Sequence, residues 1–83
     1  MAYTRAMKID WSQCPAVERD PDRMSGAWTF RNTRVPVTFL FENLDAGATV
    51  TEFVDWFEGV SAAQVHEVLS FVARCSEGKL AAA

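Results

Sequence analysis

Three side chains in this sequence of 83 residues are of the types that most often carry out covalent or acid–base chemistry: Cys14, His66 and Cys75. A cysteine nucleophile needs a histidine base within hydrogen-bond reach and a third group that orients the base. A metal site needs three or four ligands, which a single histidine without a cluster of Cys, Asp or Glu does not supply. Nothing near His66 in the sequence forms either arrangement, so we interpret it as a partly exposed side chain with no catalytic or metal-binding role. We therefore expect no catalytic residue, metal, cofactor or small-molecule substrate.

Carboxylates and glycines also give no indication of an active site. Glu52 and Asp55 lie three residues apart, which places them on one helix face and is typical of a solvated surface. The glycines are at positions 26, 47, 59 and 78, each at an expected turn or helix end rather than in a phosphate-binding loop. The sequence therefore predicts a protein that is not an enzyme.

Charge is distributed unevenly along the chain. The net charge is −3, yet six basic and four acidic residues give the stretch through Arg34 a charge of +2, so the remainder carries −5. Phosphate neutralisation supplies much of the affinity of proteins for DNA, so the acidic second half is unsuited to it. Any DNA contact should come from the first half, where the candidates are Arg19, Arg23, Arg31 and Arg34. The alternative is that these arginines are scattered over a solvated surface.

Large aromatic side chains are the strongest indication of a binding surface. Each expected helix carries one aromatic residue outside its apolar stripe: Phe39, Trp56 and Phe71. At about 100° per residue, Trp56 and Phe71 lie roughly 60° beyond the edge of their stripes, and Phe39 points almost opposite to its own. Together with Trp28 they are the candidate partner-binding residues, because exposed apolar patches mark interaction sites. The alternative is that the N-terminal segment, with Trp11 and Trp28, covers the off-stripe aromatics.

The elements that must position these side chains begin with a short β-hairpin. Residues 20–26 (DPDRMSG) are rich in turn formers. In residues 27–31, Trp28 and Phe30 alternate with smaller or polar neighbours, which is the two-residue period of a half-buried strand. We expect residues 17–19 to pair with this strand across the turn.

Three amphipathic helices follow, each with apolar residues at i, i+3, i+4 and i+7. The first should begin at Pro36, whose missing N–H costs nothing at the first helical position, and stop at Gly47. The second and third should each open with a capping box, in which two side chains satisfy each other's free backbone donors. These boxes are Thr49 with Glu52 and Ser61 with Gln64. Gly59 should end the second helix, and the third should run to residues 74–77, before Gly78.

These elements predict a mainly α fold, with a short N-terminal β-hairpin followed by a three-helix, helix-turn-helix-like bundle. We expect a single domain over residues 9–78, with flexible tails at residues 1–8 and 79–83. The start of the chain lacks the apolar core of a secretory signal, and no stretch approaches the ~20 apolar residues of a membrane span. Because the two cysteines match no disulfide framework, the sequence predicts a cytoplasmic protein with reduced thiols.

The segment at residues 26–37 (GAWTFRNTRVPV) resembles the signature of domain-of-unknown-function family 433, a set of small bacterial proteins. The residues in matching order are Thr33-Arg34-Val35-Pro36-Val37, Ala46-Gly47-Ala48-Thr49-Val50, Glu52-Phe53 and Gly59-Val60-Ser61. The resemblance covers about residues 9–76. Two positions depart from it: Glu58 replaces the usual Pro, and Asn32 replaces the usual Gly, although Asn also tolerates a positive φ.

This resemblance implies a homeodomain-like helical fold and an association with VapB-type antitoxins, often encoded beside a PIN-like nuclease toxin. It implies a non-catalytic protein that binds and neutralises such a toxin and that acts as a homodimer. The corner from Thr33 to Pro36 is the expected structural anchor, in which Arg34 bonds neighbouring carbonyls or an acidic residue of a partner. Two other functions stay open: a DNA-binding transcriptional regulator acting through the basic N-terminal half, and a homodimeric interaction module.

Overall fold

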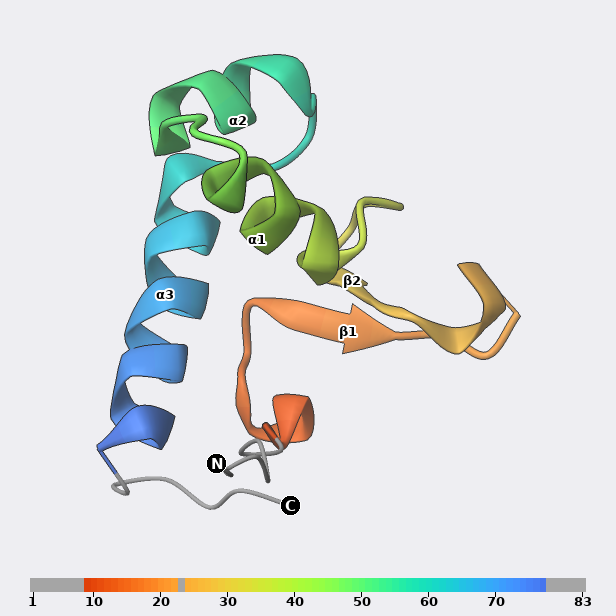
Figure 1. Cartoon of the computed structure of the whole chain (residues 1–83). Helices are drawn as coiled ribbons and strands as arrows, with labels where there is room; N and C mark the ends of the chain where they lie inside the picture. Colours follow the sequence, from red (N-terminus) through yellow and green to blue (C-terminus); the bar gives the residue numbers. More distant parts are fainter. Residues whose placement is uncertain (1–8, 23, 78–83) are drawn as a thin grey trace.

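The structure is a computed structural model that describes residues 9–22 and 24–77 (Figure 1). Within these residues an antiparallel hairpin is followed by three α-helices, which confirms the predicted mainly α fold. The strands are β1 (Val17–Arg19) and β2 (Trp28–Phe30), and the helices are α1 (Val37–Asp45), α2 (Val50–Trp56) and α3 (Ala62–Ser76). A short 3-10 segment precedes each strand: η2 (Trp11–Gln13) and η3 (Met24–Gly26), the second interrupted by Ser25 with φ 56° and ψ 31°. The expected tails at residues 1–8 and 79–83 lie outside the described residues.

The hairpin has the predicted strands. Val17 pairs with Phe30 and Arg19 with Trp28. Trp28 and Phe30 are two residues apart and therefore point to the same face of β2. On that face Phe30 lies in the core with its partner Val17, and Trp28 packs at the margin of the core. Thr29 points to the opposite face and is also buried, so both faces of β2 are covered. The turn end of the hairpin projects away from the helices (Figure 1).

Helix α1 begins one residue later than predicted. Pro36 is the N-cap, with φ −62° and ψ 142°, and the first helical residue is Val37. The reason is that Pro36 is still extended backbone that forms a bridge with Thr29 of β2, so the chain leaves the sheet and enters the helix at adjacent residues. The helix ends at Asp45. Gly47 follows with a φ of 104°, a left-handed conformation that favours glycine after a helix end, as predicted.

Both predicted capping boxes are present. At the start of α2, the Thr49 hydroxyl accepts from the Glu52 N–H at 3.1 Å, and the Glu52 carboxylate accepts from the Thr49 N–H at 2.9 Å. Ser61 and Gln64 make the same pair at the start of α3, at 3.1 and 3.0 Å. Helix α2 ends at Trp56, three residues before the Gly59 expected to end it, because Phe57 already leaves the helical conformation (φ −109°, ψ 86°).

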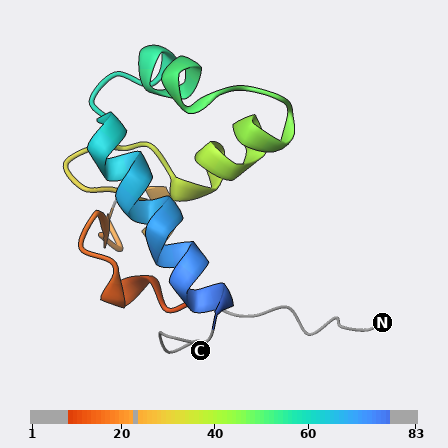
Figure 2. The ribbon, with the colours of Figure 1, turned by 90° about the vertical axis from the view of Figure 1, so that its left-hand side faces the viewer.

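The core lies between the hairpin and the three helices. Its largest fully buried side chains come from β2, α1, α2 and α3 and are Phe30, Leu40, Phe53 and Phe71. Helix α3 runs along one side of the molecule, α1 and α2 lie toward its N-terminal end, and the N-terminal segment lies beside its C-terminal half (Figures 1 and 2). No helix among the described residues has both the length and the apolar character needed to cross a membrane.

The N-terminal segment is fixed to the helices by Trp11. Its ring lies 5.6 Å from that of Phe71 and 6.4 Å from that of Phe41, between ring centroids. Asp10 caps the η2 turn that presents Trp11, since its carboxylate accepts hydrogen bonds from the side chains of Ser12 and Gln13. These bonds stabilise the charged form and lower the pKa of Asp10.

Candidate functional site

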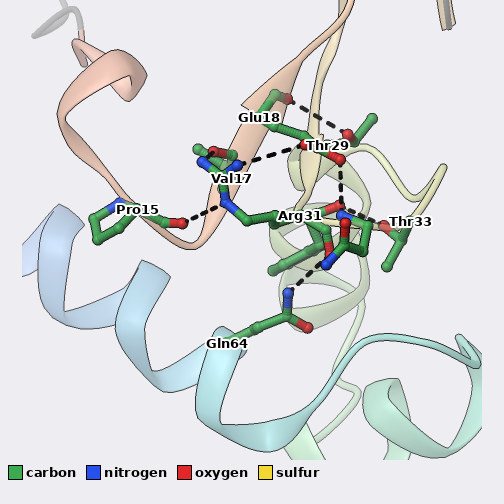
Figure 3. A network of polar contacts seen from close by, with 9 residues as sticks. Pro15, Val17, Glu18, Thr29, Arg31, Thr33 and Gln64 are labelled. Carbon is green, nitrogen blue, oxygen red and sulfur yellow. Dashed lines mark hydrogen bonds and ion pairs between the residues drawn. The ribbon is translucent and has the colours of Figure 1, made fainter.

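Arg31, directly after β2, is the centre of a polar network (Figure 3). Its guanidinium donates to the carbonyl of Pro15 at 2.9 Å and to that of Val17 at 3.0 Å, and it lies 3.6 Å from the Glu18 carboxylate. The side chain is 49% exposed. The guanidinium is therefore accessible to solvent, but its donors are already directed at the segment that leads into β1.

The backbone of Arg31 continues this network to α3. Its N–H donates to the carbonyl of Ala16 at 2.9 Å, and its carbonyl accepts from the side-chain amide of Gln64 at 3.1 Å. Gln64 uses its other amide atom in the capping box of α3. One residue thus connects the strand segment to the start of the last helix.

The corner after Arg31 is held by the side chain of Thr33, which is 7% exposed. Its hydroxyl donates to the carbonyl of Phe30 at 2.7 Å and accepts from the N–H of Val35 at 3.1 Å. Asn32 takes the left-handed conformation, with φ 65°, where the resembling family has Gly, and its N–H donates to Glu18. A threonine and a residue that tolerates positive φ are therefore what this tight corner requires.

The other candidate arginines differ from the prediction in part. The structure gives the carbonyl-binding role expected of Arg34 to Arg31 instead, and Arg34 is exposed. Arg19 donates to the carbonyl of Gly26 at 2.8 Å and closes the hairpin turn. Arg23 lies outside the described residues. Two of the four arginines, Arg19 and Arg31, thus act as anchors within the fold, and no local sequence pattern distinguishes them from Arg34.

Two of the candidate aromatics, Phe39 and Trp56, lie exposed, at 38% and 59% of their full surface. Phe39 of α1 packs edge-on against Phe57, with ring centroids 5.9 Å apart, and Phe57 stacks against the buried Phe53 at 4.6 Å. The row of rings therefore runs from the core outward to Phe39. Among the described residues, Trp56 takes part in no ring contact.

The third off-stripe aromatic, Phe71, does not belong to this surface. It is 1% exposed and contacts Trp11, so its assignment as a partner-binding residue is wrong for the folded chain. For Phe71 the alternative is correct, because the N-terminal segment covers it. Trp28 is half-buried and packs against the core, so it presents only part of its ring.

Carboxylates accompany both exposed aromatics. Glu42 lies three residues after Phe39 on α1, and Glu52 lies four residues before Trp56 on α2. Helix residues with these spacings are neighbours on one face, with Cβ atoms about 5–6 Å apart. Both carboxylates are exposed. We call Phe39, Glu42, Glu52 and Trp56 the α1–α2 surface. Sequence reasoning singled out the two rings but missed these carboxylate neighbours, although the spacing was sufficient to find them.

The residues considered for covalent chemistry lie apart from this surface. His66 is exposed on α3, and Cys14 and Cys75 are free and buried. Burial raises the pKa of the Cys14 thiol, which keeps it protonated and weakly nucleophilic at neutral pH. Within residues 9–22 and 24–77, no three His, Cys, Asp or Glu side chains form a group that could hold a metal ion.

Comparison with known protein families identifies a family over more than half of the chain. The family described as "Protein of unknown function (DUF433)" matches residues 17–72, from β1 to near the end of α3. The matched range contains Arg31, the Thr33 corner and the α1–α2 surface, but not Pro15 and Ala16 of the Arg31 network, nor Trp11 or Cys14. Neither a curated protein nor a solved structure matches the chain.

Proposed function

The chain belongs to the DUF433 family of proteins of unknown function, and we propose that it is a non-catalytic, antitoxin-like protein that binds and neutralises a PIN-like nuclease toxin in the bacterial cytoplasm. The proposal starts from the resemblance of the sequence to a family associated with VapB-type antitoxins. It needs a surface that is free to bind another protein.

The observation that carries the proposal is the exposure of Phe39 and Trp56 on neighbouring helices. The core already contains large aromatic side chains from β2, α2 and α3, so these two rings are not needed to complete it. Exposed tryptophan is among the residues that contribute most to protein–protein affinity, because its ring buries a large area at a small cost in side-chain entropy. A binding role explains why these rings remain outside the core.

Co-expression with the product of the adjacent reading frame tests this function. We expect the two proteins to co-purify, and we expect the chain to relieve the growth arrest that the neighbouring protein causes when it is expressed alone. Failure of both results for the wild-type chain would refute the antitoxin proposal.

DNA binding through the basic half is the second candidate, and the exposed position of Arg34 is the observation that favours it. The test is a salt-dependent shift of promoter DNA that disappears in Arg34→Ala. Arg31→Ala is a poor test of this role, because Arg31 holds the fold. A homodimer of the chain would double the number of basic groups offered to DNA. Light scattering at micromolar protein concentration measures whether the chain is a dimer.

A further inference from the structure

We propose that the α1–α2 surface binds an arginine-bearing segment of a partner protein, with an arginine guanidinium stacked on Trp56 and paired with Glu52. The inference rests on the proposed function in that the partner is a protein, and it specifies the chemistry of that partner.

The geometry of α2 supports this arrangement. Glu52 and Trp56 are one helical turn apart on the same face, and both are exposed. The Glu52 carboxylate is fixed in place, because the capping box holds it against the Thr49 N–H. An arginine suits such a pair, since its planar guanidinium stacks on an indole ring and its edge donates to a carboxylate. Phe39 and Glu42 repeat the combination of ring and carboxylate on α1.

Charge determines which kind of partner fits. Residues 35–73 contain six acidic residues and no lysine or arginine. Five of the six lie on or beside α1 and α2, and all five are exposed: Glu42, Asp45, Glu52, Asp55 and Glu58. Exposed rings on helices that carry one sign of charge favour a partner of the opposite sign and increase its rate of association.

The same charges disfavour the other occupants. A symmetric dimer through this surface would place the carboxylates of one copy opposite those of the other, because a two-fold interface pairs a patch with itself. Nucleic acid and anionic membranes carry the wrong sign of charge. A basic protein segment is the occupant that satisfies both the rings and the carboxylates.

Fluorescence anisotropy with labelled synthetic peptides tests the inference on the full chain. The probe is a short peptide of arginine and alanine, and its control carries glutamate in place of every arginine. We expect the arginine peptide to bind and the glutamate peptide not to bind. Trp56→Ala should weaken binding about 5-fold or more, and Trp56→Phe should restore part of it. Glu52→Gln should weaken binding about 2- to 4-fold.

Glu67→Gln is the matched control, because it also removes one exposed carboxylate, but from α3 rather than from the α1–α2 surface. It should change binding less than about 2-fold, since a distant surface charge is screened by salt. Equal losses in Trp56→Ala and Glu67→Gln, or no binding of the arginine peptide, would overturn the inference. So would a dimer that Trp56→Ala converts to a monomer, because a second copy would then occupy the surface.

The failure of this inference is distinguishable from that of the proposed function. If the wild-type chain neutralises the neighbouring protein and Trp56→Ala does so equally well, the surface assignment fails and the antitoxin function stands. If the wild-type chain neutralises nothing but binds the arginine peptide through Trp56, the function fails and the surface assignment stands.

Discussion

Arg31 and Trp56 are both large, exposed side chains, yet they belong to regions with opposite character. Arg31 is 49% exposed and donates hydrogen bonds to two backbone carbonyls near the start of β1. Trp56 is 59% exposed and, within the described residues, contacts no other ring. Exposure alone therefore does not make a side chain available to a partner. A side chain is available to a partner only if its hydrogen-bond donors or ring faces are not already used within the fold.

The two regions are connected through one core residue. Phe53 of α2 is completely buried between Phe30 of the hairpin, at 6.0 Å between centroids, and Phe57 beside the α1–α2 surface, at 4.6 Å. We expect Phe53→Ala to lower the free energy of unfolding by about 3–5 kcal/mol, because it removes both contacts and leaves a cavity. Urea denaturation followed by circular dichroism measures this loss. A loss below about 1 kcal/mol would mean that the two regions do not share a core.

A second prediction separates the anchoring arginine from the free one. Arg31→Ala should lower the free energy of unfolding by about 1–2 kcal/mol, because the carbonyls of Pro15 and Val17 lose a charged donor. Arg34→Ala, which removes the same charge at an exposed position, should change it by less than about 0.5 kcal/mol. Urea denaturation of the two variants side by side makes the comparison. Equal effects would show that the network in Figure 3 does not stabilise the fold.

Thr33 offers a smaller change at the same corner. Thr33→Val keeps the shape but removes the hydroxyl, so the partly buried N–H of Val35 loses its acceptor, at a cost of about 1–2 kcal/mol. Thr33→Ser keeps the hydroxyl and should recover most of this loss. Thermal denaturation of both variants is the measurement. A Thr33→Val protein as stable as the wild type would rule out this role for the hydroxyl.

The buried thiol predicts a modest dependence of stability on pH. Since burial raises the pKa of Cys14 in the folded state, the unfolded chain loses its thiol proton at a lower pH. The free energy of unfolding should therefore be constant below the ordinary thiol pKa of about 8.5 and fall as the pH rises above it. Cys14→Ala should flatten this part of the profile. A wild-type profile that rises above this pH would contradict the assignment.

The smallest effect on stability is expected at the α1–α2 surface. Trp56→Ala should change the free energy of unfolding by less than about 0.5 kcal/mol, because the ring is mostly exposed. Urea denaturation alongside Phe53→Ala checks this. A large loss would mean that Trp56 is part of the core and would remove the reason for assigning it a binding role.

Local patterns predicted most of the fold. The capping boxes at Thr49 and Ser61 mark helix starts through residues three positions apart, and a run of turn-forming residues marks the hairpin. Each of these signals lies within a few consecutive residues, so it can be read from the sequence alone. The end of α2 was misplaced because Phe57 leaves the helix where its ring meets Phe39 and Phe53, and no helix-ending residue marks that position.

The candidate site was predictable only in part, because its remaining features depend on contacts between distant residues. Helical spacing identified Phe39 and Trp56 as off-stripe rings. The same argument failed for Phe71, since its angle on the helix does not reveal that Trp11, sixty positions earlier, covers it. The role of Arg31 was also hidden, because its acceptors are backbone carbonyls, which carry no residue-specific pattern.

The most direct test of the central claim compares the α1–α2 surface with the basic half of the chain in a single growth-rescue assay. The chain is co-expressed with the product of the adjacent reading frame as wild type, Trp56→Ala or Arg34→Ala, with equal expression confirmed by blotting. A partner bound through the α1–α2 surface predicts that Arg34→Ala relieves the growth arrest as the wild type does and that Trp56→Ala does not. Rescue by Trp56→Ala together with loss of rescue by Arg34→Ala would contradict the account and assign function to the basic half.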